Sequence, residues 1–388
     1  MLTLRFMKVS DFNLRHLRAA HAIGDLGSIC AAAKAIHISQ PAVTQGLSKL
    51  EASLGVRLFE RHCTGMTPTP AARLLLPRVD AALRHIASSQ VTMTQLQAFV
   101  GVAAAGGYAG ASVVSGLAQP SLHRAVRDLS VVLKRPLLER RGKGVSLTTQ
   151  GKRTVRRFRL ACGELEAALS EVDALLGHET GKINIGAMPL ARARILPAAI
   201  TAFHAHVPGA NIRIIEGSFS EMIEPLRDGE IDVMIGAMRP TLPGPDVKQS
   251  SLFADQPIIL GRKDHPALAA NVDMKALAQF SWIMPPIGTP LRDQWAQVFS
   301  DAGISVPHVP INCGSVMTIR QILMETDFLT VLSPVQVAAE LDIGSLVKIA
   351  DLPQANRREI GMTTRVDWRP TAMQTAFLTI LQNTSKRL

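Results

Sequence analysis

Residues 39–61 read SQPAVTQGLSKLEASLGVRLFER, and residues 118–140 read AQPSLHRAVRDLSVVLKRPLLER. The two stretches match without a gap, so that Gln40-Pro41 corresponds to Gln119-Pro120 and Thr69 to Thr148. A gap-free internal repeat indicates a duplicated supersecondary unit. The first half of the chain is therefore predicted to hold two copies of one small module, which we call module one (10–90) and module two (91–178).

The pattern of module one is typical of a helix-turn-helix. An apolar stripe over 14–23 precedes Gly27-Ser28 and a short Ala-rich helix over 29–36. Ser39 is placed to cap a third helix, and Pro41 lies near its start, where a missing N–H costs nothing. Apolar residues of that helix share one face, which leaves polar side chains free to enter a DNA major groove. The outward face is expected to hold Thr44, Gln45, Ser48 and Lys49.

A small wing is expected after this third helix. Two short strands, over 56–59 and 66–69, follow Gly55, and a closing helix is predicted over 71–88. The basic side chains of this region are available to contact phosphates, and they are Arg57, Arg61 and His62.

Module two repeats the plan with different side chains. Its third helix opens at Gln119-Pro120, its wing carries the basic run RRGKG (140–144), and a long helix over 152–176 closes it. An apolar seam on that helix has a spacing suited to pairing with another helix, although packing on its own domain is the alternative. The seam consists of Leu165, Leu169, Val172 and Leu176. Because the helices over 71–88 and 152–176 are equivalent, they are candidates to pair with each other inside one chain.

The net positive charge of the chain lies in the repeated half. Residues 1–180 hold 23 Lys and Arg against 12 Asp and Glu, whereas residues 181–388 hold 19 of each. The whole net charge of +11 thus falls on the two modules. Such an asymmetry is typical of a polyanion-binding part joined to a neutral part.

Composition excludes several other classes of protein. No apolar window approaches the roughly 18–20 residues that span a bilayer, and the N-terminal stretch MLTLRFMKVSDFNL lacks a secretory signal, so a cytoplasmic protein is expected. The four cysteines are scattered, which favours packing thiols over a metal or disulfide site. No cofactor is expected.

The region from Lys182 onward alternates strands with helices. This pattern predicts an α/β effector domain with a largely parallel sheet over 181–388. We expect a first subdomain over 181–252 and 353–388 and a second over 253–352. In such folds ligands bind at the carboxyl ends of strands, close to helix N-termini.

The motifs together resemble those of LysR-type transcriptional regulators. The residues 39–61 with TPTPAA (67–72), and the corresponding QPSLHRAVRDL, PLLER and GVSLTTQG, resemble that family's winged helix-turn-helix. GKINIGA, LRDGEIDVMIGA, GRKDHPAL and TPLR resemble its effector-binding domain, and the likeness covers almost the whole chain. The effector half is most similar to a subgroup associated with sugar or aromatic-acid responses.

The resemblance implies the architecture and partners of a regulator. It implies all-α-rich winged helix-turn-helix modules, a linker helix that dimerises, and a two-subdomain effector domain like a periplasmic binding protein. The implied partners are promoter DNA, a small-molecule effector, further copies of the chain in a homo-oligomer, and RNA polymerase.

The resemblance also assigns DNA contacts by position. In module one they are Ser39, Gln40, Pro41, Thr44, Gln45, Lys49, Arg57 and Arg61. In module two they are Gln119, Ser121, His123, Arg124, Arg127, Arg140 and Arg141.

A second module is a departure from the family, which has one per chain. Ala118 stands where module one has Ser39, and His123 and Arg124 stand where it has Thr44 and Gln45. Module two therefore reads a different half-site, binds phosphates with little specificity, or serves as a structural platform.

The effector site implied by the resemblance lies between the two subdomains. Its candidates are Pro189, Leu190, Arg192, Ser218, Ser220, Arg239, Thr289 and Arg292. Arginines beside helix N-termini favour a small carboxylate. The alternative is that Arg292 pairs with a local carboxylate and Ser218 merely caps a helix.

Two other functions compete with a ligand-responsive regulator. An enzyme is disfavoured because the sequence has no nucleophile elbow, Walker loop, GxGxxG opening or metal-ligand cluster. An architectural DNA-binding protein without a working sensor is the other alternative.

Overall fold

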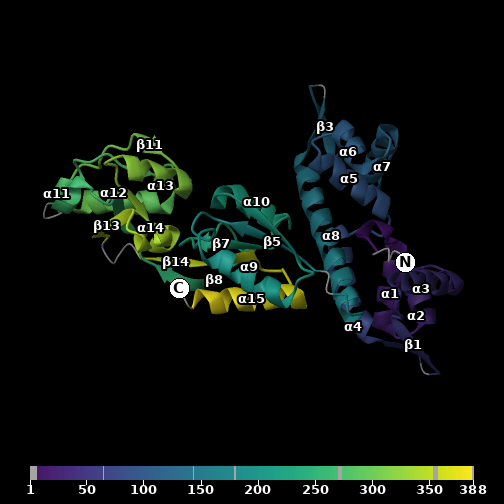
Figure 1. Ribbon diagram of the computed structural model, residues 1–388. Coiled ribbons are helices and arrows are strands. Elements are labelled where there is room, and N and C mark those ends of the chain that lie inside the picture. The colour runs from purple at the N-terminus through teal and green to yellow at the C-terminus, as the bar shows by residue number, and fades with distance from the viewer. Residues whose placement is uncertain are drawn as a thin grey trace. The chain divides into compact units, whose positions relative to one another are not determined.

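The computed structural model describes residues 7–63, 65–142, 144–178, 181–269, 273–352 and 357–386. Lys143 of the basic run, the first six residues, and residues 353–356 at the expected subdomain boundary lie outside these ranges. The chain forms two compact units, the first built mainly from residues before Ile183 and the second from most of the remainder (Figure 1).

Module one contains the expected helix-turn-helix and wing. Its elements are α1 (Leu14–Leu26), α2 (Ile29–Ala35), α3 (Gln40–Leu54), β1 (Phe59–His62), β2 (Gly65–Pro68) and α4 (Pro70–Ile86). Gly27 ends α1 in the left-handed conformation, and the Ser28 side chain accepts a hydrogen bond from the N–H of Ala31 to cap α2. Ser39 does precede α3, but its side chain makes no capping bond, so that part of the prediction is wrong.

The wing begins three residues later than predicted. Glu51 on α3 accepts hydrogen bonds from the N–H groups of Leu58 (2.7 Å) and Phe59 (3.3 Å), which ties the incoming chain to the helix before strand pairing starts. At the other strand, the Met66 N–H donates to the Gly27 carbonyl at 2.8 Å. Gly65 sits at a φ of +145° beside that carbonyl, and a Cβ there would lie 2.6 Å from the Gly27 oxygen. A glycine is therefore required where the wing meets α1.

Module two has the same order of elements. They are α5 (Met93–Ala104), α6 (Tyr108–Ser115), α7 (Gln119–Val132), β3 (Leu138–Arg141), β4 (Gly144–Leu147) and α8 (Thr149–Leu175). The Thr148 hydroxyl accepts from the Gly151 N–H to cap α8, just as Thr69 accepts from Ala72 to cap α4. That cap starts α8 three residues before the predicted position.

No single helix in the described ranges is both long and apolar enough to cross a bilayer. The neighbouring helices α5 and α6 meet the length and composition test only together, across a bend of 116°.

The closing helices α4 and α8 pack against each other within the chain, as the equivalence of their positions predicted (Figure 1). Arg78 on α4 contacts Glu164 and Glu171 on α8, whereas Arg157, nearer the start of α8, donates to the Arg84 carbonyl at 3.0 Å. The earlier residue on α4, Arg78, thus contacts later residues on α8, and the later residue on α4, Arg84, contacts the earlier Arg157. The two helices therefore run antiparallel.

One hydrophobic core joins the two modules. It includes Leu17, Leu47, Leu75, Phe99, Phe158 and Leu165. Leu165, Leu169 and Val172 of the predicted seam are buried. Leu176 is 41% exposed, because α8 ends at Leu175, so its assignment to the seam is wrong.

The second unit contains a five-stranded sheet in the order β6-β5-β7-β14-β8. Its strands are β5 (Lys182–Ala187), β6 (Asn211–Glu216), β7 (Val233–Ala237), β8 (Val247–Asp255) and β14 (Arg358–Arg365). Strands β5 and β7 are parallel, but β14 runs antiparallel to both β7 and β8. The prediction of a largely parallel sheet is confirmed only in part: β5, β7 and β8 run in the same direction, but β14 runs against its neighbours because the chain returns along it from the second lobe. Strand β8 also continues past the expected boundary at residue 252.

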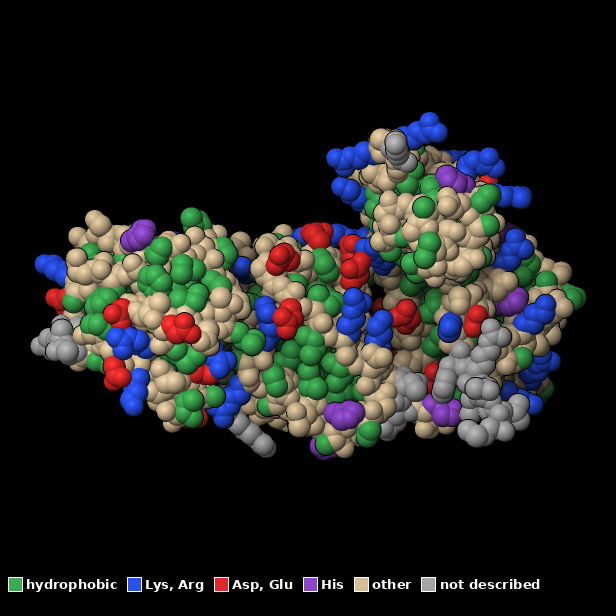
Figure 2. All heavy atoms as spheres, turned by 45° about the horizontal axis from the view of Figure 1, so that its top comes forward, with side chains coloured by type: hydrophobic (Ala, Val, Ile, Leu, Met, Phe, Trp, Pro, Cys, Tyr) green, Lys and Arg blue, Asp and Glu red, His purple; other side chains and the backbone are tan. Residues whose placement is uncertain are grey.

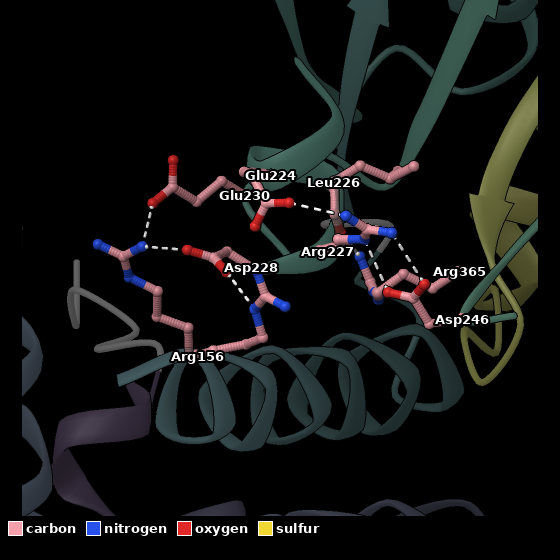
Figure 3. Close-up of polar contacts among 9 residues, drawn as sticks. Arg156, Glu224, Leu226, Arg227, Asp228, Glu230, Asp246 and Arg365 are labelled. Atoms are coloured by element: carbon pink, nitrogen blue, oxygen red, sulfur yellow. Dashed lines mark hydrogen bonds and ion pairs between the residues drawn. The ribbon is translucent and has the colours of Figure 1, made fainter. Parts of the chain in front are cut away.

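Three helices accompany this sheet, and they are α9 (Ile195–His206), α10 (Phe219–Arg227) and α15 (Ala372–Ser385). Arg227, at the end of α10, forms ion pairs with Asp246 (2.8 Å) and Glu224 (2.8 Å), and these hydrogen bonds raise its pKa (Figure 3). Arg365 on β14 donates to the Leu226 carbonyl at 2.7 Å. Two arginines thus fix the end of α10 beside the sheet.

A second, smaller lobe follows. Strand β9 (Ile258–Arg262) pairs antiparallel with β12 (Thr330–Leu332) and β13 (Leu346–Asp351). A short parallel pair joins β10 (Ile283–Met284) to β11 (Ile311–Asn312). The helices of this lobe are α11 (Met274–Leu277), α12 (Pro290–Asp301), α13 (Val316–Glu325) and α14 (Ala338–Asp342). Trp282, Trp295 and Phe299 fill its core, with ring centroids 5.3–5.7 Å apart.

Candidate nucleic-acid interface and effector site

Helix α3 has a buried apolar face and an outward polar face. Val43, Leu47, Leu50 and Leu54 are buried, as predicted. Gln45 and Lys49 are exposed, whereas Thr44 is half-buried and its hydroxyl donates to the Gln40 carbonyl at 3.1 Å. The hydroxyl proton of Thr44 is therefore engaged within the helix, which leaves its methyl group as the part best suited to contact a thymine methyl.

A close approach of α1 holds α3 in place. A Cβ at Gly46 would lie 3.0 Å from Cδ2 of His16, so the His16 ring packs against the helix backbone. Burial, and secondarily the charge of Lys49, lower the pKa of His16. A neutral imidazole therefore supports the recognition helix from behind at pH 7.

The basic side chains around the wing of module one are free to meet phosphates. Arg57 and Arg61 are exposed, and no carboxylate of the described residues lies within ion-pair distance of them or of Lys49. The Arg57 carbonyl accepts from the Thr69 hydroxyl at 2.8 Å, which fixes the Arg57 backbone. Ser39, Gln40 and Pro41, at the start of α3, are also exposed.

Module two exposes its corresponding residues. Those predicted from sequence, all exposed, are Gln119, Ser121, His123, Arg124, Arg127, Arg140 and Arg141. Figure 2 shows Lys and Arg side chains gathered around the protruding tip of this module. Arg124 and Arg127 lie 3.8 Å from the carboxylate of Asp128, a loose contact between exposed groups that leaves both able to bind DNA.

The His123 ring is not free, because it stacks on Tyr108 with centroids 3.5 Å apart and planes 20° from parallel. Burial raises the pKa of the Tyr108 hydroxyl. Tyr108 is the only tyrosine of the chain and so stands out in the sequence. The local sequence pattern did not indicate that it would contact His123.

A hollow of about 1200 Å³ lies beside α7 in module two. Its lining includes Tyr108, His123, Arg124, Arg127, Ser130 and Leu137. Ser130 occupies the position of Glu51, which in module one spans the gap from α3 to the wing. The shorter Ser130 side chain donates to the Val126 carbonyl at 3.0 Å instead and lines the hollow.

Helix α6 also differs from its counterpart. Val113 and Val114 are 86% and 85% exposed. In module one the equivalent residues, at the end of α2, are Lys34 and Ala35. A cation suited to phosphate contact has thus been replaced by an apolar side chain. The two modules share a backbone plan but present chemically different surfaces.

The effector candidates of the larger lobe follow strand ends. Pro189 is half-buried and Leu190 buried, just after β5. Arg192 forms an ion pair with Glu216 at 2.7 Å, so its guanidinium is already engaged.

Ser218 and Ser220 lie at the start of α10. The N–H and the hydroxyl of Ser218 each donate to Glu221 at 2.7 Å, and the N–H of Ser218 is the main cause of the lowered pKa of Glu221. The Ser220 hydroxyl lies 3.1 Å from that of Ser218. These contacts match the capping role that was the alternative for Ser218.

Arg239 and Arg292 keep their charge available. The Arg239 guanidinium lies 4.8 Å above the centroid of the Phe219 ring, and that of Arg292 lies 5.4 Å above Trp295. Burial lowers the pKa of both, while the charge of Asp293 opposes that shift in each case. Within the described residues, neither guanidinium has a carboxylate at ion-pair distance.

Neutral oxygens orient Arg292. It donates to the Asn312 side chain at 3.0 Å and to the Pro285 carbonyl at 3.2 Å. Thr289, at the N-cap of α12, donates its hydroxyl to the Pro286 carbonyl at 2.9 Å and makes no capping bond. Pro290 has no N–H, so the first amides of α12 are those of Leu291 and Arg292, and within the described residues the Thr289 side chain does not cap them, which is an arrangement suited to an anion.

No group of three or more His, Cys, Asp or Glu side chains in the described part of the chain is arranged to hold a metal ion.

Two family patterns match the chain. The pattern described as LysR substrate binding domain matches residues 176–386. The pattern described as bacterial regulatory helix-turn-helix protein, lysR family, matches twice, over residues 14–73 and 93–152.

Similar proteins include the HTH-type transcriptional regulator GalR of Pseudomonas putida, with 30% identity over 366 residues, 91% of this chain and 92% of that protein. The regulator PcaQ of Agrobacterium fabrum is 25% identical over 72% of this chain and 91% of its own length. The alignment with GalR covers 91% of this chain. Module two and the effector domain together, residues 91–388, have only 298 residues, so the alignment must also include part of module one.

Solved structures support the fold. ArgP from Mycobacterium tuberculosis superposes with a TM-score of 0.60 at 14% identity and covers 76% of this chain and 97% of its own. Full-length OxyR from Pseudomonas aeruginosa gives a TM-score of 0.55 at 22% identity and covers 76% and 98%.

Proposed function

Because the chain belongs to the LysR family of bacterial regulators, we propose that its module one is the base-reading half of a tandem DNA-binding unit and that its effector is a small carboxylate. The chain is a DNA-binding transcriptional regulator with an effector-binding domain, and it acts on promoter DNA as an oligomer. In this proposal it works in the cytoplasm, and module two is a second winged helix-turn-helix.

The outward face of α3 carries the DNA-reading part of the proposal. Gln45 is exposed next to Thr44, and an exposed Gln can bond adenine bidentately while a Thr methyl contacts thymine. A bidentate pair between Gln and adenine is worth about 1–3 kcal/mol of discrimination against a wrong base. Arg57 and Arg61 add phosphate contacts that position the helix without reading sequence.

The contribution of module two is electrostatic as well as chemical. Arg124, Arg127, Arg140 and Arg141 are exposed on its α7 and wing. Arginine bonds guanine bidentately in the major groove and also binds phosphates, so this module suits DNA but not the bases that suit α3.

The effector half of the proposal rests on Arg239 and Arg292, which have no carboxylate at ion-pair distance among the described residues. We divide this domain into a first subdomain built around the five-stranded sheet and a second built around β9, with the effector between them. Arg239 and Arg292 are the primary ligands, and the open amides of α12 beside Thr289 complete the anion site. Pro189, Leu190, Ser218, Ser220 and Arg192 form its wall, with less direct roles because Arg192 and Ser218 already have partners.

Titration calorimetry on the full chain tests this assignment. A panel of small carboxylates and neutral sugars is titrated into the wild type, into Arg239→Gln and Arg292→Gln, and into Arg213→Gln, an exposed arginine on β6, as the matched control. We expect at least one carboxylate to bind, with affinity reduced by both site variants and unchanged by the control. Binding of a neutral sugar that ignores both arginines would refute a carboxylate effector. Absence of any ligand would instead favour an architectural DNA-binding protein.

A further inference from the structure

The pairing of α4 with α8 has an approximate internal two-fold relation. The repeat matches Arg78 with Arg157, and Glu164 with His85. The contact of Arg78 with Glu164 should therefore have a counterpart between Arg157 and His85. Arg157 in fact donates to the carbonyl of Arg84, the residue next to His85, at 3.0 Å. The two modules thus face each other nearly as two subunits of a symmetric dimer do.

Arg78 makes this pairing specific for unlike helices. It is only 5% exposed and is held by Glu164 at 3.2 Å and Glu171 at 2.7 Å, both on α8. A second copy of α4 in the place of α8 would present His85 at the position of Glu164 and would end at Ile86, before the position of Glu171, so neither glutamate partner of Arg78 would be present. An unpaired buried charge is strongly unfavourable, so α4 selects α8.

The two reading faces of this internal dimer differ. At equivalent positions α3 carries Thr44, Gln45 and Ser48, whereas α7 carries His123, Arg124 and Arg127. His123 is held against Tyr108, a residue that replaces Ile29 of module one. The face of α7 therefore offers arginines to guanine, and the face of α3 offers an amide to adenine.

We infer that one chain occupies both half-sites of its operator and that those half-sites differ in sequence, so the chain binds DNA in a single orientation. A dimer of identical modules reads a palindrome, because protein symmetry is mirrored in the site. Two unlike modules joined in one chain remove that symmetry, so each chain of the oligomer lies in one direction along its own pair of half-sites. This inference deepens the proposed function and rests on it, because it requires both modules to contact DNA.

Selection of binding sites from a random duplex library by the full chain tests the inference. We expect an enriched motif of two dissimilar half-sites, whose centres are separated by about one or more whole helical turns. Gln45→Ala should erase sequence preference in one half-site only, and Arg124→Ala in the other. An inverted repeat of either half-site should bind about 10-fold or more weakly than the native arrangement. Gln90→Ala and Arg213→Ala, which alter exposed residues away from α3 and α7, are the matched controls.

The remaining outcomes separate this inference from the proposed function. A palindromic motif, altered in both halves by Gln45→Ala and in neither by Arg124→Ala, would overturn the inference while leaving a base-reading regulator. A single half-site without a second one would overturn it in the same way. If no motif is enriched, the base-reading role of module one fails as well.

Discussion

Nη2 of Arg78 lies 2.7 Å from Oε1 of Glu171, so a salt bridge across 93 residues joins module one to module two. The same guanidinium reaches Glu164 at 3.2 Å, and all three side chains are mostly buried. Burial lowers the pKa of Arg78, but the hydrogen bonds and charges of Glu171 and Glu164 outweigh this effect and raise the pKa overall. The cluster therefore holds together the two halves of the DNA-binding unit.

Arg78→Leu should lower the free energy of unfolding of the first unit by about 3–5 kcal/mol, because two buried carboxylates lose their partner. The triple variant Arg78→Leu/Glu164→Leu/Glu171→Leu should recover most of that loss, since no buried charge remains. Hydrogen exchange of α4 and α8 in the full chain measures both effects. A loss below about 1 kcal/mol in the single variant would show that the cluster does not hold the helices together.

The α4–α8 pair should cross-link within one chain. With the four native cysteines replaced by alanine, Arg84→Cys/Arg157→Cys treated with a short bismaleimide is expected to run as a compact monomer in a denaturing gel. The geometric basis is the Arg157 hydrogen bond to the Arg84 carbonyl. Arg84→Cys alone is the control. Cross-linked dimers formed by the double variant would place the pairing between chains instead.

Cys162 should resist alkylation in the folded protein. Burial on α8, together with the charge of Glu166, raises the pKa of its thiol to about 12. The thiolate is the reactive form, so at pH 8 the folded thiol stays protonated and should react far more slowly than exposed Cys30 and Cys63. Mass spectrometry after iodoacetamide treatment reads each site, and denaturant should abolish the difference. Equal rates in the folded chain would contradict the packing of α8.

Gly65→Ala should be far more damaging than Gly144→Ala, although the two positions are equivalent. At Gly65 a Cβ meets the Gly27 carbonyl oxygen at 2.6 Å and φ is +145°, whereas at Gly144 the nearest atom is 3.9 Å away. We expect a loss of about 1–3 kcal/mol for Gly65→Ala and little change for Gly144→Ala, by thermal unfolding of each variant. Similar losses at both sites would mean that the wing of module one does not depend on its contact with α1.

The repeat made much of the first unit predictable. Local signals such as Ser28 and Gly55 mark helix ends correctly, and the apolar spacing on α3 identifies its buried face. The equivalence of two closing helices was sufficient to predict their pairing. These features depend on residues close in sequence, or on symmetry between copies.

Other features depend on contacts that no local pattern contains. The late start of the wing follows from Glu51 bonding to Leu58, and the hollow in module two is lined by side chains from the separate elements α6, α7 and β3. The direction of β14 depends on how the chain returns from the second lobe. The ion pair of Arg192 with Glu216 likewise joins residues 24 positions apart that no local sequence pattern connects.

The most direct test is binding of the full chain to its upstream DNA and to a scrambled duplex at several salt concentrations. Thr44→Ala/Gln45→Ala should lower the ratio of specific to non-specific affinity about 10-fold or more and leave the salt slope unchanged. Arg57→Ala/Arg61→Ala, the matched pair in the same module, should keep that ratio and reduce the slope by about 2. If Thr44→Ala/Gln45→Ala leaves the ratio unchanged, module one does not read bases and the account of this regulator is wrong.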